Sequence, residues 1–145
     1  MDTKLKSDIA ESAVVTELLR KGHRVLKPVG DRLPYDLALD LNGRLVRIQV
    51  KCAWFDKKSD AYVVDARRTK TNRRQMLRER YDKDDFDFAI LYLCEEKVFY
   101  VMPVNAFTAY GSTVTLIEHD KRQRKPKSAE YRERWDLLSD GLFSR

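Results

Sequence analysis

The segment from Pro34 to Lys51, PYDLALDLNGRLVRIQVK, constrains the fold of this chain more than any other. Its Asn42-Gly43 pair stands between two runs in which apolar and polar residues alternate. Asn-Gly between such runs is the strongest short-range signal for a β-hairpin with a two-residue type I′ turn. The resulting register predicts one apolar face of the hairpin, formed by Leu37, Leu39, Val46 and Ile48.

The opposite face of the same hairpin is polar. The register pairs Asp36 with Gln49, and Lys51 follows two residues later on that face. Sheet geometry therefore predicts that these three side chains lie together. Each residue type also has an ordinary structural use: Asp caps loops, Lys on an edge strand discourages aggregation, and Gln suits a solvent-facing strand position.

A helix is predicted before the hairpin, from about Ser7 to Lys21. Ser7 is a suitable N-cap, and Gly22 is a suitable C-cap. Glu11 has apolar neighbours at helical spacing, so its carboxylate lies on a largely apolar stripe. If the helix packs on a sheet, Glu11 is either drawn toward the core or sits at the edge of the stripe and reaches water. Its apolar neighbours are Val14, Val15 and Leu18.

The rest of the chain mixes strands with short helices. Residues 69–80, TKTNRRQMLRER, are interpreted as a loop that leads into a short helix, and residues 104–110 as another short helix. Ser128 is predicted to cap a last helix, because apolar residues recur at helical spacing after it. That stripe consists of Tyr131, Trp135, Leu138 and Leu142. Further strands are predicted at residues 23–28, 61–66, 86–94, 98–102 and 113–117.

This order of elements predicts a mixed α/β (α+β) fold. A chain of 145 residues is long enough for one hydrophobic core, so we expect a single domain, 1–145, that ends in a basic segment and a helix from about 119 to 145.

No apolar run approaches the length of a membrane span, and the N-terminal residues MDTKLKSDIAES contain no secretory core. We therefore expect a cytoplasmic protein without a membrane partner. Two cysteines, Cys52 and Cys94, and two histidines argue against a zinc site and against a disulfide framework.

Positive charge is concentrated in two segments. The net charge is +6 and the isoelectric point about 9.3. Clusters of this kind suit a polyanion, because each Lys or Arg placed on a phosphate releases condensed counterions. They also suit plain solubility, and that alternative stays open. The residues expected to contact nucleic acid are Arg67, Arg68, Lys70, Arg73, Arg74, Arg78 and Arg80 in the first cluster, and Lys121, Arg122, Arg124, Lys125 and Lys127 in the second.

The polar hairpin face has the groups that phosphodiester hydrolysis requires. That reaction needs a cation held by hard oxygen ligands, and a positive group near the attacked phosphate. Asp36 and Gln49 offer oxygen ligands, with the carbonyl of Val50 as a possible third. Lys51 offers the positive group. If its helix packs against the hairpin, Glu11 can bind the metal directly or through water.

The order of Glu11, Pro34-Tyr35-Asp36 and Gln49-Val50-Lys51 resembles that of the PD-(D/E)XK nuclease superfamily of restriction enzymes and junction resolvases. The segment GHRVLKPVGDRLPYDLALDLNGRLVRIQVKCA is similar to the core of that superfamily, and the resemblance covers about residues 6–53 well. The small size and the Gln variant look most like the bacterial branch of intron-encoded homing endonucleases.

The resemblance implies a restriction-endonuclease-like core, in which helices flank a mixed central β-sheet. It also implies a Mg²⁺-dependent, sequence-specific endonuclease that cuts double-stranded DNA as a homo-oligomer, either a dimer or a tetramer. The implied catalytic residues are Glu11, Asp36, Gln49 and Lys51. In this family pattern the two acids bind the metal, with Gln49 and the Val50 carbonyl as further ligands, and Lys51 orients water or stabilises charge.

Two positions depart from the family pattern. Tyr35 separates the Pro from the Asp, and Gln49 stands where the superfamily has Glu or Asp. An amide oxygen can coordinate Mg²⁺ but brings no negative charge, so metal affinity should fall. Either Glu11 compensates, or a single metal is used, or the site is inactive. The alternatives are therefore a non-catalytic DNA-binding protein with a degenerate nuclease fold, a Holliday-junction-resolvase-like nuclease, and a basic α/β interaction protein without a nucleic-acid role.

Overall fold

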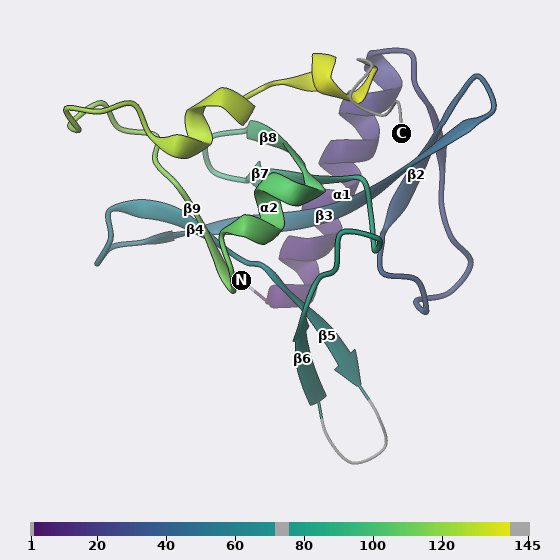
Figure 1. Cartoon of the computed structure of the whole chain (residues 1–145), viewed down its shortest axis with the longest axis horizontal. Coiled ribbons are helices and arrows are strands. Elements are labelled where there is room, and N and C mark those ends of the chain that lie inside the picture. The colour runs from purple at the N-terminus through teal and green to yellow at the C-terminus, as the bar shows by residue number, and fades with distance from the viewer. Residues whose placement is uncertain (1, 72–75, 140–145) are drawn as a thin grey trace.

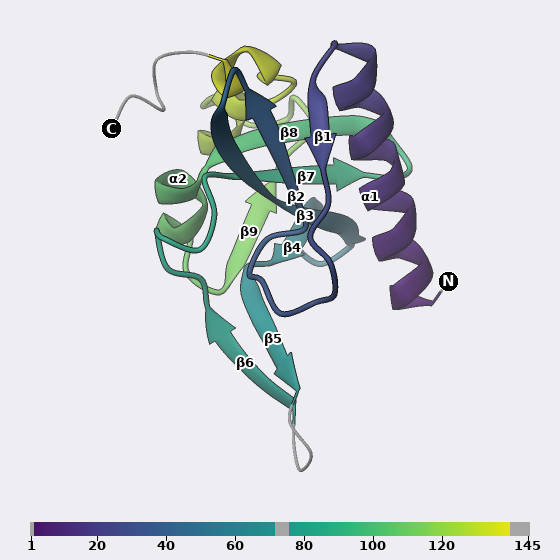
Figure 2. The same ribbon diagram turned by 90° about the vertical axis from the view of Figure 1, so that its right-hand side faces the viewer.

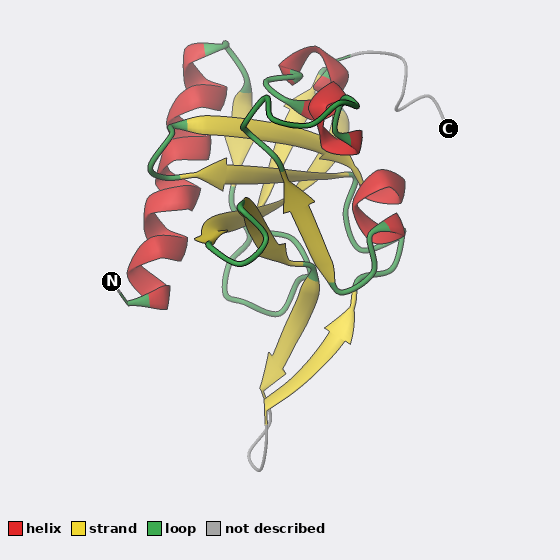
Figure 3. Cartoon of the chain, turned by 90° about the vertical axis from the view of Figure 1, so that its left-hand side faces the viewer, coloured by secondary structure: helices red, strands yellow, loops and turns green. Residues whose placement is uncertain are grey.

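The computed structural model describes residues 2–71 and 76–139, with the backbone alone for residues 69–71 and 76–78. In these residues a seven-stranded mixed sheet forms the centre of the molecule. Helix α1 (Thr3–Arg20) covers one face of the sheet, and the short helix α2 (Val104–Ala109) lies on the other side (Figures 2 and 3). The predicted mixed α/β class, with helices that flank a central sheet, is confirmed.

The long strand β3 (Arg44–Asp56) organises the sheet. It pairs antiparallel with β2 (Leu37–Leu41) at one end and with β4 (Ala61–Asp65) at the other. Between these regions it pairs in parallel with β7 (Phe88–Leu93). The other strands of the sheet are β1 (Arg24–Leu26), β8 (Val98–Pro103) and β9 (Thr113–Leu116), which pair with β2, β7 and β4.

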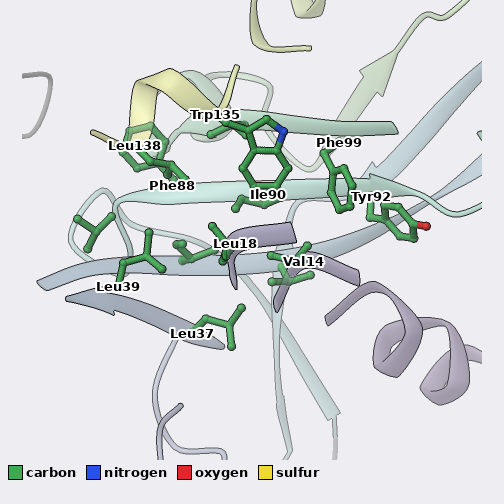
Figure 4. Close-up of a cluster of buried hydrophobic side chains, with 14 of the residues drawn as sticks. Val14, Leu18, Leu37, Leu39, Phe88, Ile90, Tyr92, Phe99, Trp135 and Leu138 are labelled. Atoms are coloured by element: carbon green, nitrogen blue, oxygen red, sulfur yellow. The ribbon is translucent and has the colours of Figure 1, made fainter. Parts of the chain in front are cut away.

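The β2–β3 hairpin has the predicted register. Leu37 faces Ile48 and Leu39 faces Val46, and all four side chains are buried. Asn42 and Gly43 both have positive φ, 54° and 88°, as the two central residues of a type I′ turn require. The hairpin therefore presents its apolar face to α1, which contributes Val14 and Leu18 to the same core (Figure 4).

Helix α1 begins earlier than predicted. Asp2 is its N-cap, with a side chain that accepts a hydrogen bond of 2.8 Å from the N–H of Lys4, and Ser7 lies inside the helix. The prediction of Ser7 as N-cap was wrong because Asp2 is an equally good cap and lies one turn farther upstream. The C-terminal boundary was close, since the helix ends at Arg20 and Gly22 follows with φ 85°.

The segment predicted as a loop and a helix, residues 69–80, is mostly a β-ribbon. Strands β5 (Arg67–Thr71) and β6 (Met76–Arg80) pair antiparallel and form a separate two-stranded sheet. Figure 1 shows this ribbon, here called the arm, extending away from the body of the molecule. The helix prediction was wrong because Arg67–Thr71 and Met76–Arg80 are mostly polar or charged and lack the apolar alternation that marks a strand in a sequence.

The predicted C-terminal helix is also wrong. Two short 3₁₀ helices, Lys127–Tyr131 and Trp135–Leu138, take its place, and Ser128 lies buried within the first instead of capping a helix. Between them Glu133 has φ 53°, and its N–H donates to the carbonyl of Phe99 while its carboxylate accepts the N–H of Phe99. Pairing with β8 therefore interrupts the helical path. Trp135 and Leu138 still pack into the α1 core, and Leu142 lies outside the described residues.

A second core fills the other side of the sheet. The aromatic side chains of Tyr81, Phe86 and Phe107 meet there, and Phe107 belongs to α2. Cys52 and Cys94 are free thiols with their sulfur atoms 3.4 Å apart. In the described part of the chain, no helix is long and apolar enough to span a membrane.

Candidate active site

All of the residues expected to form the site line one pocket, which has a volume of about 520 Å³. The pocket lies where α1 passes an interrupted edge of β3. The pairing of β3 with β2 ends at Ile48 and its pairing with β4 begins at Trp54. Among the described strands, only β7 pairs with residues 49–53, so the other backbone edge of β3 stays open there. The expected site residues on its wall are Glu11, Asp36, Gln49, Val50 and Lys51.

Asp36 forms hydrogen bonds to backbone groups on this open edge of β3, as a neighbouring strand would. Its N–H donates to the carbonyl of Ile48 at 2.9 Å, and its Oδ2 accepts the N–H of Val50 at 2.9 Å. The predicted cross-strand pairing of Asp36 with Gln49 is not formed, because the regular ladder begins at Leu37 and Asp36 turns toward Val50. The backbone donor thereby holds the carboxylate at the pocket.

The surroundings of Asp36 favour its protonated form. Burial raises the pKa of the Asp36 carboxyl above its ordinary value, while the hydrogen bond from Val50 opposes that shift. The charge of Glu11 raises the pKa further, and Lys51 and Lys27 lower it. A carboxylate that is partly desolvated and lies near a second acid is electrostatically suited to a cation.

Glu11 lies at the edge of the apolar stripe of α1 and not in the core. Its side chain is 30% exposed, and its Oε1 is 2.7 Å from Nζ of Lys27, which is 64% exposed. This contact raises the pKa of Lys27, first through the hydrogen bond and then through the charge of Glu11. Lys27 was not predicted as part of the site, because a single lysine after a short strand forms no sequence pattern.

Gln49 is buried, with 8% of its surface exposed. Its Nε2 donates to the carbonyl of Val50 at 3.4 Å. Rotation of the amide by half a turn exchanges its oxygen and nitrogen, so the same side chain can present an acceptor to a cation. Gln49 thus sits beside the backbone carbonyl that was expected to join it as a ligand.

Lys51 lies on the pocket wall nearest the arm. Its Nζ donates to the carbonyl of Arg67 at 3.0 Å and lies 5.1 Å from the ring centroid of Tyr81. Burial raises the pKa of the Tyr81 hydroxyl, and the charge of Asp36 adds to that shift. Tyr81 was not predicted either, since one tyrosine after a basic segment has no distinguishing spacing.

The donor set suits a hard divalent cation. Two carboxylates, one amide and one backbone carbonyl are oxygen donors of the kind that Mg²⁺ prefers. Within the described residues, His, Cys, Asp and Glu nowhere gather in a group of three that could hold a metal. A cation here would therefore depend on Gln49 and Val50 as well as on the two acids. Asp65 also lines the pocket, but its carboxylate accepts hydrogen bonds of 3.0 Å from the backbone N–H and the Nε of Arg67.

The first basic cluster adjoins this pocket through the arm. Arg67 lines the pocket at the base of β5. Farther along the arm base, Arg68 donates to the carbonyl of Arg32 at 3.3 Å, and Arg80 donates to that of Thr108 at 3.2 Å. The backbone of Lys70 and Arg78 belongs to the two strands of the arm, whereas Arg73 and Arg74 lie outside the described residues.

The second basic cluster lies elsewhere. Its residues follow β9, and three of them, Arg122, Arg124 and Lys125, line a different hollow. None of the cluster lines the pocket that holds Asp36. Lys121 pairs with Asp60 at 3.4 Å, and the ammonium of Lys127 lies 4.9 Å from the ring centroid of Tyr110. Figure 1 shows this segment and the arm on different sides of the molecule. The other members of the cluster, Arg122, Arg124 and Lys125, are exposed.

Comparisons with known proteins identify the family and the fold. The family model described as PD-(D/E)XK endonuclease matches residues 1–138. A solved structure, "The structure of a bacterial homing endonuclease: I-Ssp6803I", is 53% identical in sequence. The match covers 95% of this chain and 93% of that one, with a TM-score of 0.86. No curated protein matches the chain. Since the family model spans nearly the whole sequence, the chain belongs to the PD-(D/E)XK endonuclease family.

Proposed function

We propose that this endonuclease is a Mg²⁺-dependent homing endonuclease that hydrolyses double-stranded DNA at a specific sequence. The observation that carries the proposal is the pocket on the open edge of β3, which holds the acids, the amide and the lysine together. Similarity to a bacterial homing endonuclease over 95% of the chain supports the homing assignment.

Five of the residues that line the pocket have distinct parts in the proposed reaction. Asp36 and Glu11 hold the metal, with the Gln49 amide and the Val50 carbonyl as neutral ligands. A bound divalent cation supplies a polarised phosphate and a water of lowered pKa. Lys51 places its positive charge near the attacking water and the phosphate oxygens, where negative charge accumulates.

Opening of the Glu11–Lys27 pair accompanies metal binding in this scheme. Lys27 is largely exposed, so its ammonium can move from Glu11 into water at little cost. Once released, the Glu11 carboxylate can turn toward Asp36 and supply part of the negative charge that Gln49 lacks. Lys27 is then free to contact a DNA phosphate at the pocket rim.

Double-strand cleavage suggests more than one subunit. A chain with one pocket cuts one strand, and two chains related by symmetry cut both strands of a duplex. We therefore propose a homo-oligomer, a dimer or a tetramer. In it the arm, which is continuous with the pocket through Arg67, faces the DNA, and the second basic cluster contacts DNA at another place.

A selection assay tests the function. A supercoiled plasmid library with randomised inserts is incubated with the protein in Mg²⁺, in EDTA, and with the Lys51→Ala variant in Mg²⁺. We expect a defined set of inserts to be nicked or linearised by wild-type protein in Mg²⁺ alone. A library in which wild-type protein cuts no insert in Mg²⁺, or in which Lys51→Ala cuts the same inserts equally well, contradicts the proposal.

The neutral amide of Gln49 also supports a second candidate, a DNA-binding protein that has lost catalysis. That protein would bind DNA in a salt-sensitive manner, and neither Mg²⁺ nor Asp36→Ala would change its affinity. A gel-shift titration with linear duplex and with a four-way junction separates both candidates from a junction resolvase, which would favour the branched DNA.

A further inference from the structure

The base of the arm contacts the lysine of the pocket from two sides. The carbonyl of Arg67, the first residue of β5, accepts a hydrogen bond of 3.0 Å from Nζ of Lys51. The ring of Tyr81, which directly follows β6, lies below the same ammonium with its centroid 5.1 Å away. Both ends of the arm therefore meet at Lys51.

The Tyr81 ring is fixed in place by the core. Only 8% of its surface is exposed. Its ring packs edge-on against Phe86, with centroids 5.2 Å apart, and against Phe107 at 6.1 Å. Those two rings also contact each other, with centroids 5.6 Å apart, so three aromatic side chains brace one another. A ring held in this way offers a rigid, electron-rich face to a cation.

The Arg67 carbonyl is fixed as well. Arg67 pairs with Arg80 in the ladder nearest the body, and its own N–H donates to Asp65 at 3.0 Å. Its Nε makes a second contact of 3.0 Å with the same carboxylate. The peptide that accepts the Lys51 hydrogen bond is thus held by the arm on one side and by the end of β4 on the other.

We propose that Tyr81 is a positioning residue for Lys51. A lysine ammonium on a flexible four-carbon stem can adopt many positions, and the ring restricts it to the one in which the Arg67 carbonyl also receives a hydrogen bond. The restriction places the positive charge at the pocket before DNA arrives, so the lysine loses less conformational entropy in the reaction. The inference rests on the proposed nuclease function for its catalytic consequence, although the contact itself does not.

The consequence is a link between DNA binding and cleavage. The Arg67 carbonyl and the Tyr81 ring both belong to the base of the arm, and the arm also bears residues of the first basic cluster. DNA that engages the arm therefore acts on the structure that positions the lysine. A change at Tyr81 should affect the rate of cleavage and leave the affinity for DNA almost unchanged.

The test compares three variants. Tyr81→Leu removes the ring, Tyr81→Phe keeps it, and Phe99→Leu removes a ring of equal exposure, 8%, from the other core. The single-turnover rate is measured on the duplex that wild-type protein selects, and the dissociation constant on the same duplex in Ca²⁺. We expect the Tyr81→Leu rate to fall roughly three- to thirtyfold, with an unchanged dissociation constant. Phe99→Leu should lose thermal stability but keep its rate, and Tyr81→Phe should recover most of the rate.

A spectroscopic measurement tests the contact without any cleavage. The ε-methylene protons of Lys51, assigned with Lys51→Arg, should resonate upfield in wild-type protein because of the Tyr81 ring current. The shift should persist in Tyr81→Phe and disappear in Tyr81→Leu. Equal shifts in wild type and Tyr81→Leu overturn the proposal, as does a Tyr81→Leu rate equal to that of Phe99→Leu. If wild-type protein cuts no duplex, the nuclease function fails, and the resonance shift still decides whether Tyr81 holds the lysine.

Discussion

The ammonium of Lys27 lies 2.7 Å from the carboxylate of Glu11, which lines both the pocket that contains Asp36 and the adjoining hollow that contains Lys27. One of the two carboxylates that are proposed to hold the metal is therefore already paired with a positive side chain. This contact connects the end of β1 to α1. The Lys27 ammonium and a metal ion would therefore compete for the Glu11 carboxylate.

Removal of Lys27 should strengthen metal binding. In Lys27→Met the Glu11 carboxylate loses its competitor, so we expect Ca²⁺ to bind about two- to fivefold more tightly, as the strength of an exposed ion pair suggests. Isothermal titration calorimetry measures the affinity. The matched control is Lys21→Met, which removes a Lys–Glu pair, of 3.6 Å to Glu17, from another part of the same helix. Equal affinities in both variants would contradict a metal-linked role for Glu11.

Asp36→Asn should stabilise the metal-free protein at neutral pH. Burial raises the pKa of Asp36 above the ordinary value of 3.8, so the native state holds this proton more tightly than the unfolded chain does. Between 3.8 and the raised value, the free energy of unfolding therefore falls as the pH rises. Asn removes the charge, and its Oδ1 can still accept the N–H of Val50.

Thermal melts in EDTA provide the measurement for Asp36. We expect the Tm of Asp36→Asn to exceed the wild-type Tm by a few degrees at neutral pH, with a difference that shrinks as the pH falls toward 3.8. Mg²⁺ should raise the Tm of wild-type protein and not that of the variant. A variant that melts lower than wild type at every pH would show that the Asp36 carboxylate stabilises the fold.

Gln49→Glu should lower the stability of the metal-free protein and raise its affinity for Mg²⁺. The substitution puts a second carboxylate near Asp36 at a position with 8% exposure, so repulsion and burial should lower the Tm of the metal-free protein. The added charge should tighten Mg²⁺ binding by roughly tenfold or more. Calorimetry with Mg²⁺, beside melts in EDTA, tests both effects. An unchanged affinity would remove Gln49 from the proposed ligand set.

Lys51→Ala should separate DNA binding from cleavage. Loss of a positive group that faces the accumulating charge should lower the single-turnover rate by about 10²–10³. One charge among many at the DNA surface should change the dissociation constant only slightly. The two constants are measured on one duplex, in Mg²⁺ and in Ca²⁺. A proportional loss of both would make Lys51 a phosphate contact instead.

The two basic clusters can be compared by salt dependence. Arg68→Ala changes the base of the arm, and Arg124→Ala changes the exposed second cluster. If each side chain neutralises a phosphate, each variant should reduce the slope of log affinity against log salt by about 1. Fluorescence anisotropy over a range of NaCl concentrations measures the slope. A slope that Arg124→Ala leaves unchanged would place the second cluster outside the DNA interface.

Errors in predicting the fold have a common physical origin. The arm was predicted as a loop and a helix because its strands carry almost no apolar residues, and a strand is recognised in a sequence mainly by alternation of apolar and polar residues. Trp135 and Leu138 of the predicted C-terminal helix pack in the core, but the helix itself does not form, because Glu133 pairs with the backbone of Phe99. Each error lies where a long-range contact overrides the local pattern or where the sequence has no apolar pattern to read.

The sequence by itself determined the β2–β3 hairpin and its two faces. Asn42-Gly43 sets the turn, the turn sets the register, and the register decides which side chains point to α1. These are relations between residues close in the chain, so spacing alone predicts them. The spacing of Glu11, Asp36, Gln49 and Lys51 likewise sufficed to indicate the family.

Only the tertiary structure decided how the site residues are held. The contacts of Val50 with Asp36, of Lys27 with Glu11 and of Tyr81 with Lys51 join residues that no periodicity connects. They arise because α1, the end of β1 and the base of the arm converge on the stretch of β3 where strand pairing is interrupted. Packing of distant segments sets these distances, and with them the electrostatics of the pocket.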